Sequence, residues 1–165
     1  MTLQQVLFII FGAITLGAAL MVVTRRNVFH AALFLILSFF GIAGLYVLLE
    51  APFLAATQMF IYVGGIAILI LFALMLTQDM MNPNLTGANR QWGLAALVAV
   101  ALCAVLGWTV LNHNWAVTPG DVPAESIVNL GKALVDPAGL VLPFEVASVM
   151  LLVALIGAVT IARER

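Results

Sequence analysis

The chain of 165 residues is 65% hydrophobic and only 8% charged, and its mean hydropathy is +1.22. Soluble domains carry about 25% charged residues, so this composition excludes a water-soluble globular protein. The formal net charge of −1, without any basic stripe, gives no means of binding nucleic acid. The single cysteine, Cys103, cannot form an internal disulfide, and no Cys and His spacing indicates a metal site.

Five stretches of about 20 mostly apolar residues are long enough to cross a membrane as helices. They cover residues 3–23, 28–49, 53–76, 92–111 and 140–162. The first is too long for a secretory signal, and Arg25-Arg26 follows it instead of preceding it, so we expect it to remain in the mature protein. The sequence therefore predicts an all-α integral membrane bundle of five transmembrane helices, in one membrane domain over residues 1–165.

Capping residues and prolines predict where the helices begin. Asn27 can accept a hydrogen bond from a free amide at the start of the second helix. Pro52 and Pro143 stand where first helical positions are expected, and a missing N–H costs nothing there. The run Asn82-Pro83-Asn84 breaks the chain between the third and fourth spans. Because the first two connections are short, the first three helices should run up, down and up.

The basic residues predict the orientation of the chain, because short cytoplasmic loops are enriched in lysine and arginine. With five alternating spans, one side of the membrane receives Arg25, Arg26, Arg90, Arg163 and Arg165. The other side receives only Lys132. We therefore expect the N-terminus outside and the C-terminus in the cytoplasm.

One connection, residues 112–139, is long and should lie on the outer side. Within it, Ile127, Leu130 and Leu134 recur at helical spacing. They predict either an amphipathic helix on the membrane surface or against a partner, or a disordered loop with one apolar turn.

The predicted spans hold no charged residue at mid-membrane depth, where such groups usually mark an ion path. Glu50 and His30 lie near the two ends of the second helix. The polar residues at depth are hydroxyls such as Thr15 and Ser38, which can donate to backbone carbonyls. The chain therefore has no proton path of its own, and without a nucleophile–base pair we expect no catalytic residues.

Glu145 lies near the start of the fifth helix and allows two interpretations. A carboxylate in the first turn is stabilised by free backbone amides and by the helix dipole. Alternatively, the carboxylate handles protons where it is buried against another subunit.

The third span contains the most unusual segment, Gln58-Met59-Phe60-Ile61-Tyr62-Val63-Gly64-Gly65. Each glycine inside a helix weakens it by about 1 kcal/mol relative to alanine. The pair allows either a packing notch for a neighbouring helix or a switchable segment with a π-bulge, which is often found at functional sites. Tyr62 stands beside this weak point, and Gln58 lies one turn earlier on the same face.

Three segments together resemble one family. They are Asn27-Val28-Phe29-His30-Ala31-Ala32-Leu33, then residues 58–76 with Tyr62-Val63-Gly64-Gly65, and finally Pro143-Phe144-Glu145-Val146-Ala147-Ser148 continued by Ala154-Leu155-Ile156-Gly157-Ala158. In this order and spacing they resemble subunit J of proton-translocating NADH-quinone oxidoreductase (complex I), the equivalent of mitochondrial complex I subunit 6. The resemblance covers nearly the whole chain, apart from the third and fourth connections.

The resemblance implies a π-bulge in the third helix at Tyr62, Val63, Gly64 and Gly65. This bulge would act as a conformational gate, opening or closing a water path between the quinone region and the antiporter-like subunits. Some relatives have a glutamate where this chain has Gln58, so the polar role expected here is hydrogen bonding to water. Gln58 and Glu145 are the candidate polar contacts of the proton path.

The resemblance also implies partners and cofactors. The partners would be other complex I membrane subunits, especially the equivalents of K, A, H and N, within the lipid bilayer. FMN, iron–sulfur clusters and quinone would belong to other subunits, and this chain is expected to bind no cofactor or metal. The expected function is that of a membrane-arm subunit of a respiratory NADH:quinone oxidoreductase, which helps to couple quinone reduction to proton translocation. Its expected location is the cell inner (plasma) membrane, as a multi-pass protein.

Two alternatives stay open. The chain could be the homologous subunit of a ferredoxin-fed photosynthetic-type complex in a thylakoid-type membrane, because the electron donor is bound by other chains. It could also be a purely structural membrane subunit whose only task is helix packing.

Overall fold

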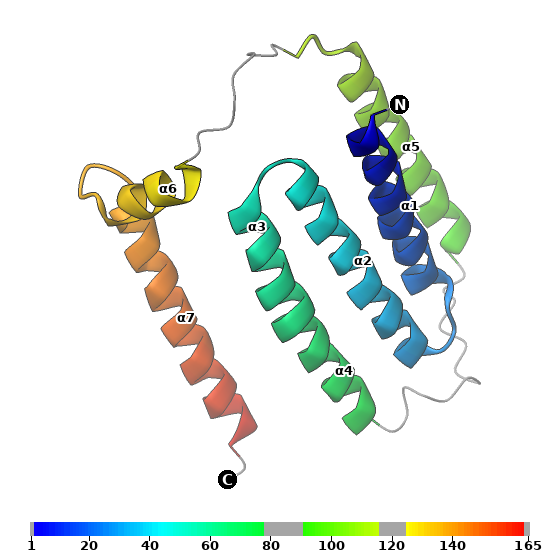
Figure 1. The fold of residues 1–165 in the computed structure, drawn as a ribbon. Coiled ribbons are helices and arrows are strands. Elements are labelled where there is room, and N and C mark those ends of the chain that lie inside the picture. The colour runs from blue at the N-terminus through cyan, green and yellow to red at the C-terminus, as the bar shows by residue number, and fades with distance from the viewer. Residues whose placement is uncertain (1, 78–90, 116–124, 164–165) are drawn as a thin grey trace. The chain divides into compact units, whose positions relative to one another are not determined.

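The computed structural model describes residues 2–77, 91–115 and 125–163, and all regular structure within these ranges is helical (Figure 1). The elements are α1 (Leu3–Thr24), α2 (Val28–Leu48), α3 (Pro52–Thr57), the π-helix η1 (Gln58–Ile66), α4 (Ala67–Leu76), α5 (Trp92–Asn112), α6 (Ser126–Val135) and α7 (Val141–Ala162). The chain forms two compact units, Met1–Thr118 and Pro119–Arg165.

Five helical stretches of the described chain are long and apolar enough to cross a membrane, and they confirm the predicted spans. Four are single helices, α1, α2, α5 and α7, and the fifth is the continuous stretch Pro52–Leu76 formed by α3, η1 and α4. Each predicted boundary lies within one residue of the observed one. The predicted break at Asn82-Pro83-Asn84, and the basic residues Arg90 and Arg165, lie outside the described residues.

The predicted residues stand at the starts of α2 and α3. The Asn27 side chain caps α2 by accepting hydrogen bonds from the backbone N–H of Phe29 at 3.0 Å and of His30 at 3.4 Å. Pro52 is the first residue of α3, as expected. At the start of α1, Thr2 and Gln5 form a reciprocal capping box, which was not among the predicted caps.

Two expectations at the start of the last span are wrong. The helix α7 begins at Val141, so Pro143 is its third residue and not its first, and Glu145 lies beyond the first turn. Proline is tolerated at the third position because the first amides of a helix have no partner within it. Glu145 is therefore too far along the helix to be stabilised by those free amides.

The helices α1 and α2 pack antiparallel with very close backbones. At the two glycines of α2, an added Cβ would lie 3.2 Å from the backbone nitrogen of Thr15 at Gly41, and 2.8 Å from Cγ of Phe11 at Gly44. The Ser38 hydroxyl donates to the Thr15 carbonyl at 3.2 Å. Lipid tails are as apolar as side chains, so close approach and interhelical hydrogen bonds hold such helices together.

The helix α2 is central to the three-helix arrangement of its unit, with α1 on one side and α3, η1 and α4 on the other (Figure 1). No large side chain is fully buried among the described residues. The buried positions are instead small or polar: Ala18, Ala32, Ser38, Gly41, Ala43, Ala55, Gln58 and Ala67. This pattern is typical of membrane helices that associate through small residues.

The long connection contains a helix, α6, over the residues whose spacing predicted one. It belongs to the second unit and contacts α7. The described part of this connection is therefore not the loop with a single apolar turn that stood as the alternative.

The turn between α2 and α3 places a glutamate in a strained conformation. Glu50 has φ of 54° in the left-handed region. Its N–H donates to the Val47 carbonyl at 3.1 Å and the Ala51 N–H donates to the Tyr46 carbonyl at 3.0 Å, the two bonds of a Schellman helix end. Glycine is the usual residue at this position because a Cβ raises its energy.

We expect the Gly41→Leu substitution to destabilise the protein by about 1–3 kcal/mol, because the new side chain must enter a filled contact with Thr15. Native membranes are solubilised and heated, and immunoblotting then measures the fraction of the chain that remains soluble. Gly17→Leu in α1 is the matched control, since an added Cβ at Gly17 meets nothing within 4 Å. Equal losses for both variants would contradict the packing argument.

We expect the Glu50→Gly substitution to stabilise the protein by about 1 kcal/mol, because it relieves the left-handed strain. The same heating assay measures the gain. Glu50→Ala keeps the Cβ and should give no comparable gain. If alanine stabilises the chain as much as glycine does, the backbone strain is not the cause.

Candidate functional site

The third span contains a π-helix of nine residues, Gln58–Ile66, between two α-helical parts. At its end the Ala67 N–H donates to the Tyr62 carbonyl, five residues back. The segment includes Tyr62, Val63, Gly64 and Gly65, the four residues named above as the candidate gate. It is longer than the single-turn π-bulges that usually interrupt α-helices.

The π-helix determines which face of α4 lies against α2. Gln58 and Ala67 are both buried, and both of their elements contact α2. A regular α-helix turns by about 100° per residue, so the nine positions between them would set Ala67 about half a turn away from Gln58. A π-helix bonds each N–H five residues back and so has more residues per turn, which brings Ala67 back toward the face of Gln58. The shared buried face therefore depends on the π form.

Phe39 of α2 contacts the π-helix in two ways. Its carbonyl accepts a long hydrogen bond, 3.5 Å, from the Gln58 amide nitrogen, and Gln58 is only 6% exposed. Its ring meets the Tyr62 ring edge to face, with centroids 5.6 Å apart and planes at 77°. Phe39 could not be predicted as a contact of this segment, because nothing in the sequence distinguishes it from the chain's other nine phenylalanines.

Tyr62 contributes its ring and not its hydroxyl to the packing of the chain. The side chain is 42% exposed, and the hydroxyl makes no hydrogen bond within the described residues. The hydroxyl therefore donates to no backbone carbonyl in the described part of the chain. The hydroxyl is available to water or to a neighbouring chain.

The two glycines of the π-helix have no other helix of the described chain against them. An added Cβ at Gly64 would lie 3.4 Å from the Met59 carbonyl, and at Gly65 it would lie 3.8 Å from the Phe60 carbonyl. Both contacts are within the same segment. Gly64 and Gly65 are therefore not a packing notch inside the described part of this chain, unlike Gly41 and Gly44 of α2.

The hydroxyls at membrane depth bond to carbonyls, as the sequence predicted. Thr15 donates to the Phe11 carbonyl at 2.8 Å within its own helix, whereas Ser38 donates across to α1. With Gln58 they put one polar side chain on each of three neighbouring helices. All three are used in packing, so none is a free ionisable carrier.

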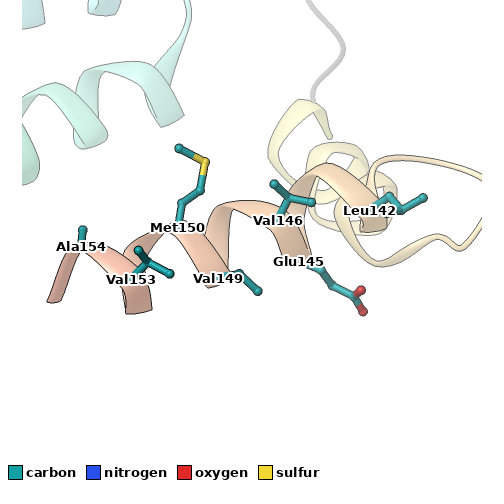
Figure 2. A pocket seen from close by; sticks show the side chains of 7 residues that line it. All are labelled: Leu142, Glu145, Val146, Val149, Met150, Val153 and Ala154. Atoms are coloured by element: carbon teal, nitrogen blue, oxygen red, sulfur yellow. The ribbon is translucent and has the colours of Figure 1, made fainter. Parts of the chain in front are cut away.

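Glu145 belongs to the second compact unit. It lines an open hollow along α7 whose other lining residues, among them Val146, Val149 and Val153, are all apolar. In Figure 2 its carboxylate extends from the helix on the side away from Met150. The carboxylate makes no hydrogen bond or ion pair within the described residues. Glu145 is thus a carboxylate on an otherwise apolar helix surface.

Within the described ranges, no three His, Cys, Asp or Glu side chains gather as metal ligands would. What the first unit offers is a helix with an unusual hydrogen-bond pattern, a buried amide and a tyrosine hydroxyl. Such a set can change shape and bond to water.

Comparison with known proteins agrees with the resemblance described above. Residues 18–161 match the model of the family NADH-ubiquinone/plastoquinone oxidoreductase chain 6. The chain is 42% identical to the NAD(P)H-quinone oxidoreductase chain 6 of Leptolyngbya boryana, over 98% of this chain and 80% of the relative. It is 36% identical to the F(420)H(2) dehydrogenase subunit J of Methanosarcina mazei, over 98% and 92%. It is 38% identical to the chloroplastic NAD(P)H-quinone oxidoreductase subunit 6 of Mesostigma viride, over 91% and 79%.

We expect the Phe39→Leu substitution to destabilise the protein by about 1 kcal/mol, because the edge-to-face pair with Tyr62 is lost. Tyr62→Phe keeps the ring and should leave the stability unchanged. The heating assay on solubilised native membranes distinguishes the two variants. A loss of stability for Tyr62→Phe equal to that for Phe39→Leu would show that the hydroxyl, and not the ring pair, is the stabilising group.

Proposed function

The chain belongs to the family NADH-ubiquinone/plastoquinone oxidoreductase chain 6, and we propose that it helps to couple quinone reduction to proton translocation by gating a water path at its third helix. It is a multi-pass membrane subunit of an oxidoreductase complex, in a plasma or thylakoid membrane.

The observation that carries the proposal is the π-helix Gln58–Ile66 in the third span. A change of this segment to a regular α-helix would rotate α4 by about half a turn relative to Gln58. Ala67 would leave the α2 contact, and the opposite face of α4, with Leu69 and Leu76, would replace it. The surface that the third span offers to water and to neighbouring subunits would then differ between the two forms.

Such a rotation is compatible with the bilayer because both helix forms bond the backbone internally. Gly64 and Gly65 reduce the preference of the segment for any one helix form, because they lack the side chain that favours a regular helix. An event elsewhere in the complex needs only a modest difference in affinity for the two forms to shift their populations. Quinone chemistry in another subunit is the event we propose.

The polar groups of the proposed path are Gln58, the Tyr62 hydroxyl and Glu145. Gln58 is an amide and cannot carry a proton at neutral pH, so its role is to bond to water and to the Phe39 carbonyl. The Tyr62 hydroxyl has no partner among the described residues and can order a water molecule. The Glu145 carboxylate would act where a partner subunit covers it.

We further propose that the complex is a respiratory NADH:quinone oxidoreductase, with FMN, iron–sulfur clusters and quinone bound by other subunits. Partners of this chain are other subunits of the complex, and we propose the equivalents of K, A, H and N. Relatives at similar identity are named for different donors, NAD(P)H and F(420)H(2). A ferredoxin-fed photosynthetic-type complex is therefore the alternative, and the donor-binding subunits purified with the chain would distinguish the two.

We expect the Gly64→Leu substitution to lower proton pumping by the assembled complex by up to about fivefold, since 1 kcal/mol of bias between two forms changes their ratio by that factor. The measurement is proton uptake or release by native membrane vesicles, with quinone reduction recorded in parallel. Gly107→Leu in α5 is the control, because an added Cβ at Gly107 meets nothing within 4 Å, and at Gly64 it meets only the Met59 carbonyl of its own segment.

Parental rates of quinone reduction and pumping in a fully assembled Gly64→Leu complex would refute the gate. The Tyr62→Phe variant then separates gating from a purely structural role. A structural subunit predicts that this variant changes assembly or nothing at all. A water path that uses the hydroxyl predicts slower pumping at normal assembly.

A further inference from the structure

The short amphipathic helix α6 is joined to α7 by a tightly bonded turn. The Leu140 N–H donates to the Ala133 carbonyl at 2.8 Å, and the Gly139 N–H donates to the Asp136 carbonyl at 2.9 Å. The Asp136 carboxylate accepts a third bond, from the Ala138 N–H at 3.0 Å. These bonds fix the direction of α6 relative to α7 within the second unit.

The turn places α6 at the end of a membrane span. Figure 1 shows α6 lying across the start of α7 instead of continuing its axis. The helix α7, with 22 residues, is long and apolar enough to cross a membrane. Since α7 begins at Val141, directly after the turn, α6 lies where this span leaves the hydrocarbon layer.

The residues of α6 divide into three faces when they are set about 100° apart around the helix axis. Leu130, Ala133 and Leu134 are partly covered and form the first face. The second face is apolar and uncovered: Ile127, Val128 and Val135 are 51%, 52% and 68% exposed. Asn129 and Lys132 form the third face, which is polar and exposed.

The order of these faces around the helix indicates which kind of molecule covers the exposed apolar face. The apolar face spans an arc of about 100° and borders Lys132, which lies about 40° beyond Val128. A lysine at such an edge can extend its ammonium to the lipid phosphates while its methylene chain stays on apolar surface. This is the arrangement of helices that lie in the plane of a membrane interface.

We propose that α6 is a lipid-binding helix that lies in the headgroup zone of the bilayer, with Ile127, Val128 and Val135 in the acyl boundary and Lys132 at the phosphates. The occupant of the exposed apolar face is phospholipid, and not another protein chain. The bonded turn makes α6 and the start of α7 one body, so the lipid contact fixes the depth of α7. This proposal does not depend on the gate at the third helix.

The test uses the complete complex, reconstituted into vesicles of phosphatidylcholine and phosphatidylglycerol. A photoreactive diazirine amino acid replaces Val128 in one variant and Asn129 in a second, and mass spectrometry identifies what each captures after illumination. We expect lipid adducts from position 128 at a level several-fold above those from position 129. Replacement of Val135 provides an independent second position if the first variant fails to assemble.

Three outcomes would overturn the proposal. Capture of another subunit by positions 128 and 135 would show that a protein covers this face. Equal lipid adducts from position 129 would show that the helix has no oriented lipid face. Absence of lipid adducts from both apolar positions would show that α6 does not reach the acyl boundary.

Discussion

Helices in a bilayer gain nothing by hiding apolar side chains from one another, since the lipid is equally apolar. The first three spans depend on this constraint. They meet through glycine, alanine and backbone-directed polar groups, and the large side chains remain on the outside. The helix α2 shows it most clearly, with Gly41 and Gly44 against α1 and the Phe39 carbonyl toward Gln58. A contact surface of small residues also resists rotation less than interlocked large side chains would.

The π-helix follows from the same constraint. Its backbone groups must bond within the segment because the bilayer offers no water to replace lost bonds. A change of winding therefore has to preserve internal bonding, and a change between π and α forms does so. The change of winding instead alters which side chains face α2. Gln58 and Ala67 share the face toward α2 only when the nine positions between them make about two turns. Local backbone geometry is thereby coupled to the packing of the whole third span.

The sequence predicted the five spans and several of their capping residues, because apolar length and cap chemistry are local properties. It misjudged the start of α7, where a proline is tolerated throughout the first turn and therefore marks no single position. The adjacent pair Gly64 and Gly65 suggested a packing notch as one interpretation, whereas Gly41 and Gly44 make the close contacts with the neighbouring helix. Phe39 was missed because its importance comes from the residues that α2 brings beside it.

The sequence by itself determined that this chain lies in a membrane, where it crosses, and that it has no Asp, Glu, Lys, Arg or His at mid-membrane depth. Each of these follows from composition and from apolar runs along the chain. Only the tertiary structure decided that the third span is wound as a π-helix over Gln58–Ile66 and that α6 turns across the start of α7. Both depend on backbone hydrogen bonds, and the same residues could form such bonds with other partners. Packing, and not the sequence pattern, therefore selects which of these bonds are formed.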